Sequence, residues 1–121
     1  MNRCFKKGDE RQMIPYVMLD EIMKESGRKT GYTLLDERHG CVNGSRCGIS
    51  VYRNETYAAA SSHEDQEGFF VLEGQGSALI GEEELLLAPG MAFMIPAHTP
   101  HAMRKAQDCE SCRVFWFHAA V

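Results

Sequence analysis

The strongest constraint on the fold is a series of short β-type runs that fills the chain from about residue 31 to its end. Most of these runs are rich in β-branched, aromatic or leucine residues, and turn sequences such as Asn43-Gly44 and Pro89-Gly90 separate them. In chain order the runs are GYTLLDE, GISVYR, TYAAASS, GFFVLEG, GSALIG, EELLLA, AFMIPA, HAMRK and CRVFWFHAAV. Eight or nine short strands at this spacing predict an all-β barrel or sandwich rather than alternating strands and helices.

The length of the chain indicates a single domain. With 121 residues it is long enough to bury one core and too short for two. Ahead of the strands, apolar residues recur at helical spacing at Val17, Met18, Ile22 and Met23. We therefore predict a short helix within residues 15–26, ended by Gly27. The expected organisation is an N-terminal arm with this helix over residues 1–30 and a β-barrel over residues 31–121.

Composition excludes several classes of partner. A net charge of −4 leaves no basic surface for nucleic acid or for anionic lipid. The sequence holds no apolar stretch near the roughly 18 residues that a membrane span needs, and its first residues lack the apolar core of a signal peptide. Five cysteines, an odd number, argue against a disulfide framework. We expect a cytoplasmic protein that binds neither nucleic acid nor a membrane.

A histidine and a carboxylate stand where the chain enters its most apolar run. His63 follows the run TYAAASS, and because residues i and i+2 of a strand face the same side, it shares a face with Ser61. Glu67 comes after a gap that suits a tight turn and opens the next strand, so it can return towards His63. A proline-stiffened loop then delivers His101 to the start of another strand.

Two imidazoles and one carboxylate from three strand ends can converge on one divalent ion. Imidazole suits zinc, nickel, copper and iron, and two histidines with one carboxylate form the known facial arrangement of non-haem iron. Each residue alone has an ordinary alternative, because a histidine near a strand end is more often solvated or hydrogen-bonded. The residues alone leave both interpretations open for His63, Glu67 and His101, and only the wider sequence pattern decides between them.

The spacing of these residues resembles the two sequence motifs of the cupin family. The first motif, G-x5-H-x-H-x3–4-E-x6-G, is matched by His63, Glu67 and Gly74. The second, G-x5-P-x-G-x2-H-x3-N, is matched by Gly90, Pro96 and His101. The resemblance covers about half of the chain and is to small single-domain cupins. It implies a cupin β-barrel (double-stranded β-helix, or jelly roll) that holds a divalent transition metal, Fe, Mn, Ni or Zn, through His63, Glu67 and His101.

Four positions depart from the motifs. Glu55 stands at the opening glycine, Ser61 at the first histidine, His98 at the second-motif glycine and Lys105 at the final asparagine. A neutral hydroxyl binds late divalent metals far less well than imidazole, so the Ser61 corner is open to water or a substrate atom. His98 is a possible replacement ligand, although its turn suits an outward position equally well.

The resemblance implies that the protein binds or converts a small molecule inside the barrel. We expect an interior lined by Phe70, Leu72, Phe93, Met94, Ile95 and Phe115 or Phe117. Tyr57, His98 and His118 are candidate bases, each with packing or a solvated tip as the ordinary alternative. Because cupins include dioxygenases, isomerases, decarboxylases and lyases, the reaction stays open. The alternative function is a metal-free sugar or small-ligand sensor that resembles the N-terminal cupin domain of arabinose-type regulators.

Two further features concern the thiols and the assembly. CESC, residues 109–112, is a C-x-x-C pair, but it lacks the strand-to-helix setting that lowers a thiol pKa, so incidental cysteines are favoured over a redox site. A barrel with an amphipathic arm and an exposed edge strand protects that edge most simply by pairing, and twofold dimers are the commonest solution. We predict a homodimer.

Overall fold

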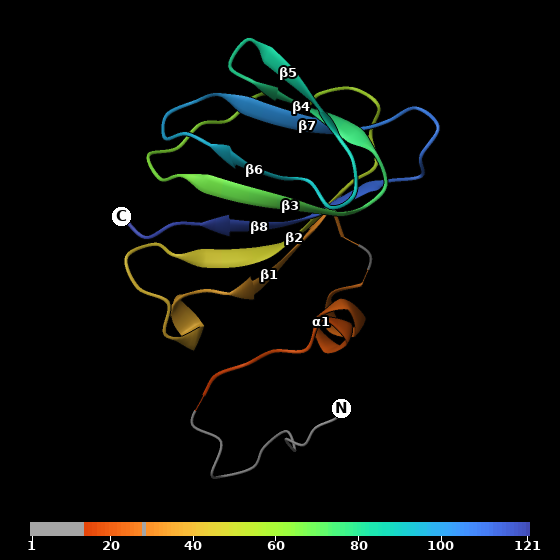
Figure 1. Cartoon of the computed structure of the whole chain (residues 1–121). Coiled ribbons are helices and arrows are strands. Elements are labelled where there is room, and N and C mark those ends of the chain that lie inside the picture. Colours follow the sequence, from red (N-terminus) through yellow and green to blue (C-terminus); the bar gives the residue numbers. More distant parts are fainter. Residues whose placement is uncertain (1–13, 28) are drawn as a thin grey trace.

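The computed structural model describes residues 14–27 and 29–121, and the predicted all-β fold with a short N-terminal helix is confirmed (Figure 1). The described residues form α1 (Leu19–Ser26), β1 (Gly31–Leu35), the 3-10 helix η1 (Glu37–His39), β2 (Arg46–Tyr52), β3 (Glu67–Glu73), β4 (Gly76–Ile80), β5 (Glu83–Leu87), β6 (Ala92–Ile95), β7 (His101–Lys105) and β8 (Cys112–His118). The strands make two antiparallel sheets, ordered β1-β2-β8-β3-β6 and β5-β4-β7.

The main core lies between the two sheets, and both contribute to it. Its buried residues are Phe69, Val71, Ala78, Leu87, Ile95, Met103, Cys112 and Val114. They alternate along each strand with residues that face outward, as the pleat of a strand requires. On β3, for example, Phe69 is 4% exposed and Phe70 is 42% exposed.

This alternation corrects part of the predicted interior. Phe93 and Ile95 pack in the core as expected, whereas the expectation was wrong for four residues that face outward: Phe70, Leu72, Met94 and Phe117. Phe115 also leaves the barrel interior and packs in a second cluster on the outer side of the large sheet. The cause is the phase of β3 and β8, since the buried Glu67 places the odd-numbered residues of β3 inside.

Helix α1 begins four residues later than predicted and covers the outer face of β1 and β2 (Figure 1). Its apolar side packs against a small buried cluster of Tyr32, Ile49 and Val51. Gly27 ends the helix with a positive φ of 73°, and its carbonyl accepts a 2.9 Å hydrogen bond from the Tyr32 hydroxyl. The predicted arm also includes residues 1–13, which lie outside the described residues.

The run TYAAASS was predicted as a strand and is not one. It forms an irregular, mostly exposed segment, paired to the sheets through one isolated bridge between Ser61 and His101. Alanine and serine side chains are too small to pack a pleated surface, which explains why the segment does not join a sheet. Across the described residues, no helix has both the length and the apolar character that crossing a membrane requires.

Candidate metal centre

The predicted site residues come together because strand ends meet at one end of the barrel. Glu67 opens β3 and lies opposite His118, the last residue of β8. His101 opens β7, and its backbone exchanges hydrogen bonds of 2.9 and 3.1 Å with Ser61. The His63 carbonyl accepts a 2.7 Å hydrogen bond from the His98 backbone, which ties this irregular segment to the loop before β7.

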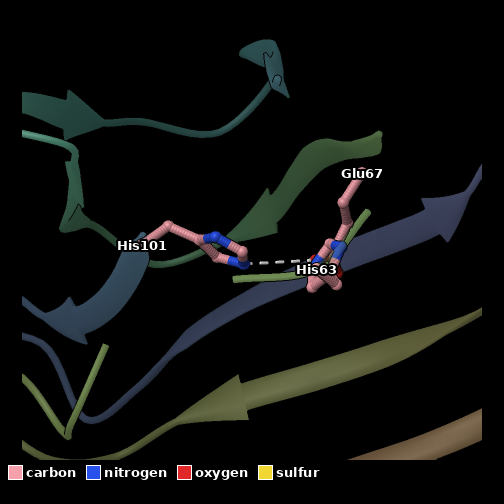
Figure 2. A group of neighbouring side chains, drawn as sticks. All are labelled: His63, Glu67 and His101. Atoms are coloured by element: carbon pink, nitrogen blue, oxygen red, sulfur yellow. Dashed lines mark hydrogen bonds and ion pairs between the residues drawn. The ribbon is translucent and has the colours of Figure 1, made fainter. Parts of the chain in front are cut away.

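Three histidines surround the Glu67 carboxylate. Nε2 of His63 lies 3.1 Å from Oε1 of Glu67, and Nε2 of His101 lies 3.4 Å from the same oxygen. Figure 2 shows His101 reaching from β7 towards the His63–Glu67 pair. From the opposite strand, Nε2 of His118 lies 3.3 Å from Oε2 of Glu67. Glu67 and His101 are buried, and His63 is half-buried.

Backbone carbonyls set the tautomer that two of these rings adopt when they are neutral. Nδ1 of His101 lies 2.9 Å from the Thr99 carbonyl, and Nδ1 of His63 lies 3.0 Å from the Asp65 carbonyl. A carbonyl only accepts, so each Nδ1 carries a hydrogen and each neutral ring presents an Nε2 lone pair to the carboxylate. Carboxylates also only accept. The centre therefore needs a cation, either a proton or a metal ion, to stabilise it.

A second carboxylate, Asp65, holds two of the histidines from behind. Its Oδ1 lies 2.7 Å from Nδ1 of His63, and its Oδ2 lies 2.8 Å from Nδ1 of His118. Arg46 adds positive charge, with Nη1 3.8 Å from Oδ2. A carboxylate that accepts from the outer nitrogen of a ring whose other nitrogen faces the ion is a common arrangement at metal sites. Asp65 therefore orients both Nε2 atoms towards Glu67.

The pKa values in this network follow from its hydrogen bonds. Burial lowers the pKa of His63, but hydrogen bonds to the Asp65 backbone and to the Glu67 and Asp65 carboxylates outweigh it, and the pKa stands above its ordinary value. Burial raises the pKa of Asp65, but its hydrogen bonds, with that from His118 foremost, lower it further than burial raises it. Asp65 therefore stays a carboxylate at neutral pH.

The donor set fits a divalent transition metal. The ligand atoms of His63, Glu67 and His101 all lie within 4.8 Å of one another. Bonds of about 2.1 Å place neighbouring ligand atoms about 3.0 Å apart in an octahedron and about 3.4 Å apart in a tetrahedron. The distances of 3.1 and 3.4 Å from the His63 and His101 nitrogens to Oε1 of Glu67 match these two values. Imidazole nitrogen with one carboxylate is also the set that iron, manganese, nickel and zinc accept.

A cavity of about 400 Å³ opens onto this cluster. Ser61, Glu67 and His101 line the end next to the cluster, with apolar walls that include Phe69 and Met103. Tyr52 also lines the cavity, and burial raises the pKa of its phenol to about 12, so it remains a hydrogen-bond donor at neutral pH. Small-molecule sites usually combine apolar walls with a few convergent polar groups in this way.

Two predicted candidates lie apart from the cluster. His98 has an exposed side chain and a positive φ of 63°, and only its backbone contacts the His63 segment. The Tyr57 hydroxyl hydrogen-bonds to Ser77 at 2.7 Å and to Glu84, on the outer side of the β5-β4-β7 sheet. These contacts engage the phenol away from the barrel interior.

Three residues of the site escaped sequence reasoning, namely Arg46, Tyr52 and Asp65. Asp65 lies in the acidic sequence EDQE, which predicts a solvent-exposed turn rather than a buried carboxylate. Its only signal is that it stands two residues before Glu67 and two after His63. Tyr52 and Arg46 lie on β2, so their approach to the site depends on long-range strand pairing.

Cys112 of the C-x-x-C pair lacks the exposure and the lowered pKa of a reactive thiol. Cys109 and Cys112 are free thiols in the described part of the chain, and Cys112 is fully buried. Burial, with a smaller contribution from Cys109, raises the pKa of Cys112 to about 11. A thiol of this kind is inert at neutral pH.

Solved structures of known proteins share this fold. The polyketide cyclase RemF from Streptomyces resistomycificus has a TM-score of 0.63 at 20% identity, over 73% of this chain and 62% of its own. FeII HppE in complex with substrate has a TM-score of 0.64 at 22% identity, over 74% of this chain and 52% of its own. A cupin protein from Bacteroides fragilis has a TM-score of 0.66 at 16% identity, over 78% and 79%.

Sequence comparison agrees with the fold. This chain spans about half to two-thirds of the length of the RemF and HppE chains. Comparison with curated protein sequences gives no significant match. The family model described as Cupin domain matches residues 49–118, more than half of the chain, and this range contains both motifs and the whole histidine–carboxylate cluster. The barrel is a cupin barrel, and the chain belongs to the cupin domain family.

Proposed function

We propose that this protein binds a divalent transition metal through His63, Glu67 and His101 and uses it to hold a small molecule in the adjoining cavity. The observation that carries the proposal is the convergence of two imidazole Nε2 atoms on one buried carboxylate. Three acceptors facing one another are unfavourable without a cation between them. A metal ion with open positions towards the cavity satisfies all of them at once.

The donor set is compatible with Fe, Mn, Ni or Zn. When bound, such an ion supplies Lewis acid chemistry at a carbonyl or carboxylate, or activates water or dioxygen. The structural neighbour HppE binds FeII and its substrate, which supports a metal and a small ligand on a barrel of this fold. At 22% identity it supports no particular reaction for this chain.

The cavity lining favours a ligand with an acidic group. Among the described residues that line it, the charged side chains are Glu67 at the metal end and Arg53. Neutral polar groups, Thr30, Asn54 and Thr56, accompany Arg53. A small carboxylate or phosphonate could therefore place one end at the ion and the other near the guanidinium. A thermal-shift screen of such acids on the metal-loaded protein, with Arg53→Gln as the comparison, tests this preference.

The alternative function is a metal-free sugar or small-ligand sensor. The same cavity favours it, because apolar walls with Tyr52, Ser61 and Asn54 also suit a polyol. The two functions differ in what stabilises the Glu67 cluster. A sensor needs only protons there, whereas a metalloprotein takes up about one ion per chain.

Elemental mass spectrometry of the purified protein decides between them. We expect about one transition-metal ion per chain in the wild type and its loss in the His63→Ala/His101→Ala double variant. His98→Asn is the matched control, because His98 is exposed and asparagine tolerates its positive φ. Absence of metal from the wild type, even after iron, manganese, nickel and zinc are added back, would contradict the proposal and favour the sensor.

The homodimer and the cytoplasmic location remain predictions. The outer face of β3, β6 and β8 carries four exposed apolar residues, Phe70, Leu72, Met94 and Phe117, which together form the outer apolar face. A second copy of the chain packed there would remove apolar surface from water.

A further inference from the structure

The open question at this centre is which residue supplies the imidazole that the motif places at Ser61. Ser61 is exposed, and its backbone is committed to His101. A serine hydroxyl is a weak ligand for late divalent metals. The inference below rests on the proposed function: if a metal ion binds here, another histidine of the fold can supply the third imidazole.

His118 is placed for this role by the pairing of β3 with β8. The register sets His118 directly opposite Glu67, and both side chains belong to the cluster at the same end of the barrel. Its Nε2 lies 3.3 Å from Oε2 of Glu67, the second oxygen of the carboxylate whose Oε1 faces His63 and His101. The His118 and His63 rings are adjacent, with centroids 4.7 Å apart.

The orientation of His118 is held by groups that do not face the ion. Nδ1 lies 2.8 Å from Oδ2 of Asp65, which leaves Nε2 free to bind. The Trp116 ring packs edge-on at a centroid distance of 5.4 Å and limits rotation of the imidazole. The side chain is only 10% exposed, so little solvent competes for its nitrogen.

The cavity approaches the cluster from another side. Its lining includes Ser61, Glu67 and His101, while Asp65 and Arg46 contact His118 from behind. A ligand on β8 would therefore bind from the side of the cluster away from the cavity. The Ser61 corner then stays open to an incoming molecule.

We propose that His118 is the third imidazole ligand, so that the ion is bound by His63, Glu67, His101 and His118. The exogenous ligand binds at the corner that Ser61 leaves open. The third imidazole is therefore supplied by the end of β8 rather than by the segment before β3. Asp65 positions His118 together with His63.

X-ray absorption spectroscopy of the zinc- or cobalt-loaded wild type tests this without any substitution. We expect three imidazoles per ion. Competition with a chelating dye then compares His118→Ala with the wild type, and we expect the affinity to fall about tenfold or more. His98→Asn serves as the control and His101→Ala as the positive reference, with circular dichroism to check that each variant is folded.

The outcomes separate this inference from the proposed function. Three imidazoles in the wild type and one fewer in His118→Ala support it. Two imidazoles in the wild type, or unchanged affinity in a folded His118→Ala, overturn it while the metal site of His63, Glu67 and His101 stands. A wild type that takes up no metal overturns both.

The open corner has its own test in Ser61→His. A histidine there competes for the position of the incoming molecule, so we expect the variant to retain metal and to lose binding of azide, a small anionic probe read from the cobalt spectrum. Unchanged azide binding in the metal-loaded variant would contradict the assignment of this corner.

Discussion

Nε2 of His63 lies 3.1 Å from Oε1 of Glu67, although both atoms are hydrogen-bond acceptors when the ring is neutral. Nε2 of His101 faces the same oxygen at 3.4 Å. Acceptor atoms this close repel one another, so a cation between the nitrogens and the carboxylate oxygen stabilises these contacts. This cluster of acceptors lies at the inner end of the cavity, so a cation bound there can also contact a molecule in the cavity.

Replacing Glu67 with glutamine should stabilise the metal-free protein and weaken metal binding. The amide nitrogen can donate to both Nε2 atoms, so we expect the metal-free protein to gain about 1 kcal/mol, a rise of a few degrees in Tm. The neutral amide is a poor ligand, so metal should no longer raise Tm. Thermal unfolding at pH 8.5 with EDTA and with zinc measures both effects.

Glu67→Ala is the matched comparison, because it removes the carboxylate without adding a donor. If Glu67→Gln and Glu67→Ala were equally destabilised in EDTA, the orientation of the two rings inferred from Thr99 and Asp65 would be incorrect.

Asp65→Asn should weaken metal binding although Asp65 does not face the ion. An amide at this position cannot accept equally from His63 and His118, so one ring loses its orientation. Outer partners of this kind are typically worth about 10- to 100-fold in affinity. Chelator competition measures the change, and Glu64→Gln, an exposed neighbour, is the control. Equal affinity in the two variants would show that Asp65 is only a structural carboxylate.

The fold and the convergence of the first three residues of the candidate site were predictable from local information. Strand runs, turn residues and the spacing of His63, Glu67 and His101 are all encoded within short segments. The placement of His118 is not, because it depends on which strand pairs with β3, and His118 lies 51 residues after its partner Glu67. Sequence reasoning could propose His118 as a candidate but could not bring it to Glu67.

The facing of the aromatic residues could have been predicted from one further step. If Glu67 points into the barrel, the period of two makes Phe69 and Val71 internal and Phe70 external. The predicted strand TYAAASS does not form, and the cause is the size of its side chains rather than the phase of the strand. Its small side chains bury too little surface to offset the entropy of ordering the backbone in a sheet.

Gly76→Ala should destabilise the barrel. A Cβ at this position would overlap the Arg104 carbonyl, which belongs to the paired strand β7 and cannot shift without breaking the ladder. Overpacking of this type costs about 1 to 3 kcal/mol. Gly31→Ala is the matched control, since its nearest neighbour would be the Ile49 carbonyl at 3.7 Å. Denaturant unfolding compares the two, and equal midpoints would contradict the close approach of β4 to β7.

Cys112 should make stability fall at alkaline pH. Burial raises its pKa from 9.0 to about 11, so above pH 9 the unfolded chain releases a proton that the folded chain retains. The unfolded state is then favoured increasingly as the pH rises towards 11. Cys112→Ala should flatten this dependence in urea titrations between pH 8 and 10.5. The Cys109→Ser/Cys112→Ala variant should keep its full metal content, and a loss of metal would revive a thiolate site.

The outer apolar face should mediate self-association. Phe70, Leu72, Met94 and Phe117 are 40 to 45% exposed on neighbouring strands, and water contact with such a surface is unfavourable. We expect light scattering after size exclusion to give the mass of a dimer for the wild type and of a monomer for Met94→Lys. Leu86→Lys is the control, because Leu86 is 73% exposed on β5 in the other sheet. A wild type that is monomeric at high concentration would contradict the dimer, and a Leu86→Lys monomer beside a Met94→Lys dimer would move the interface to β5.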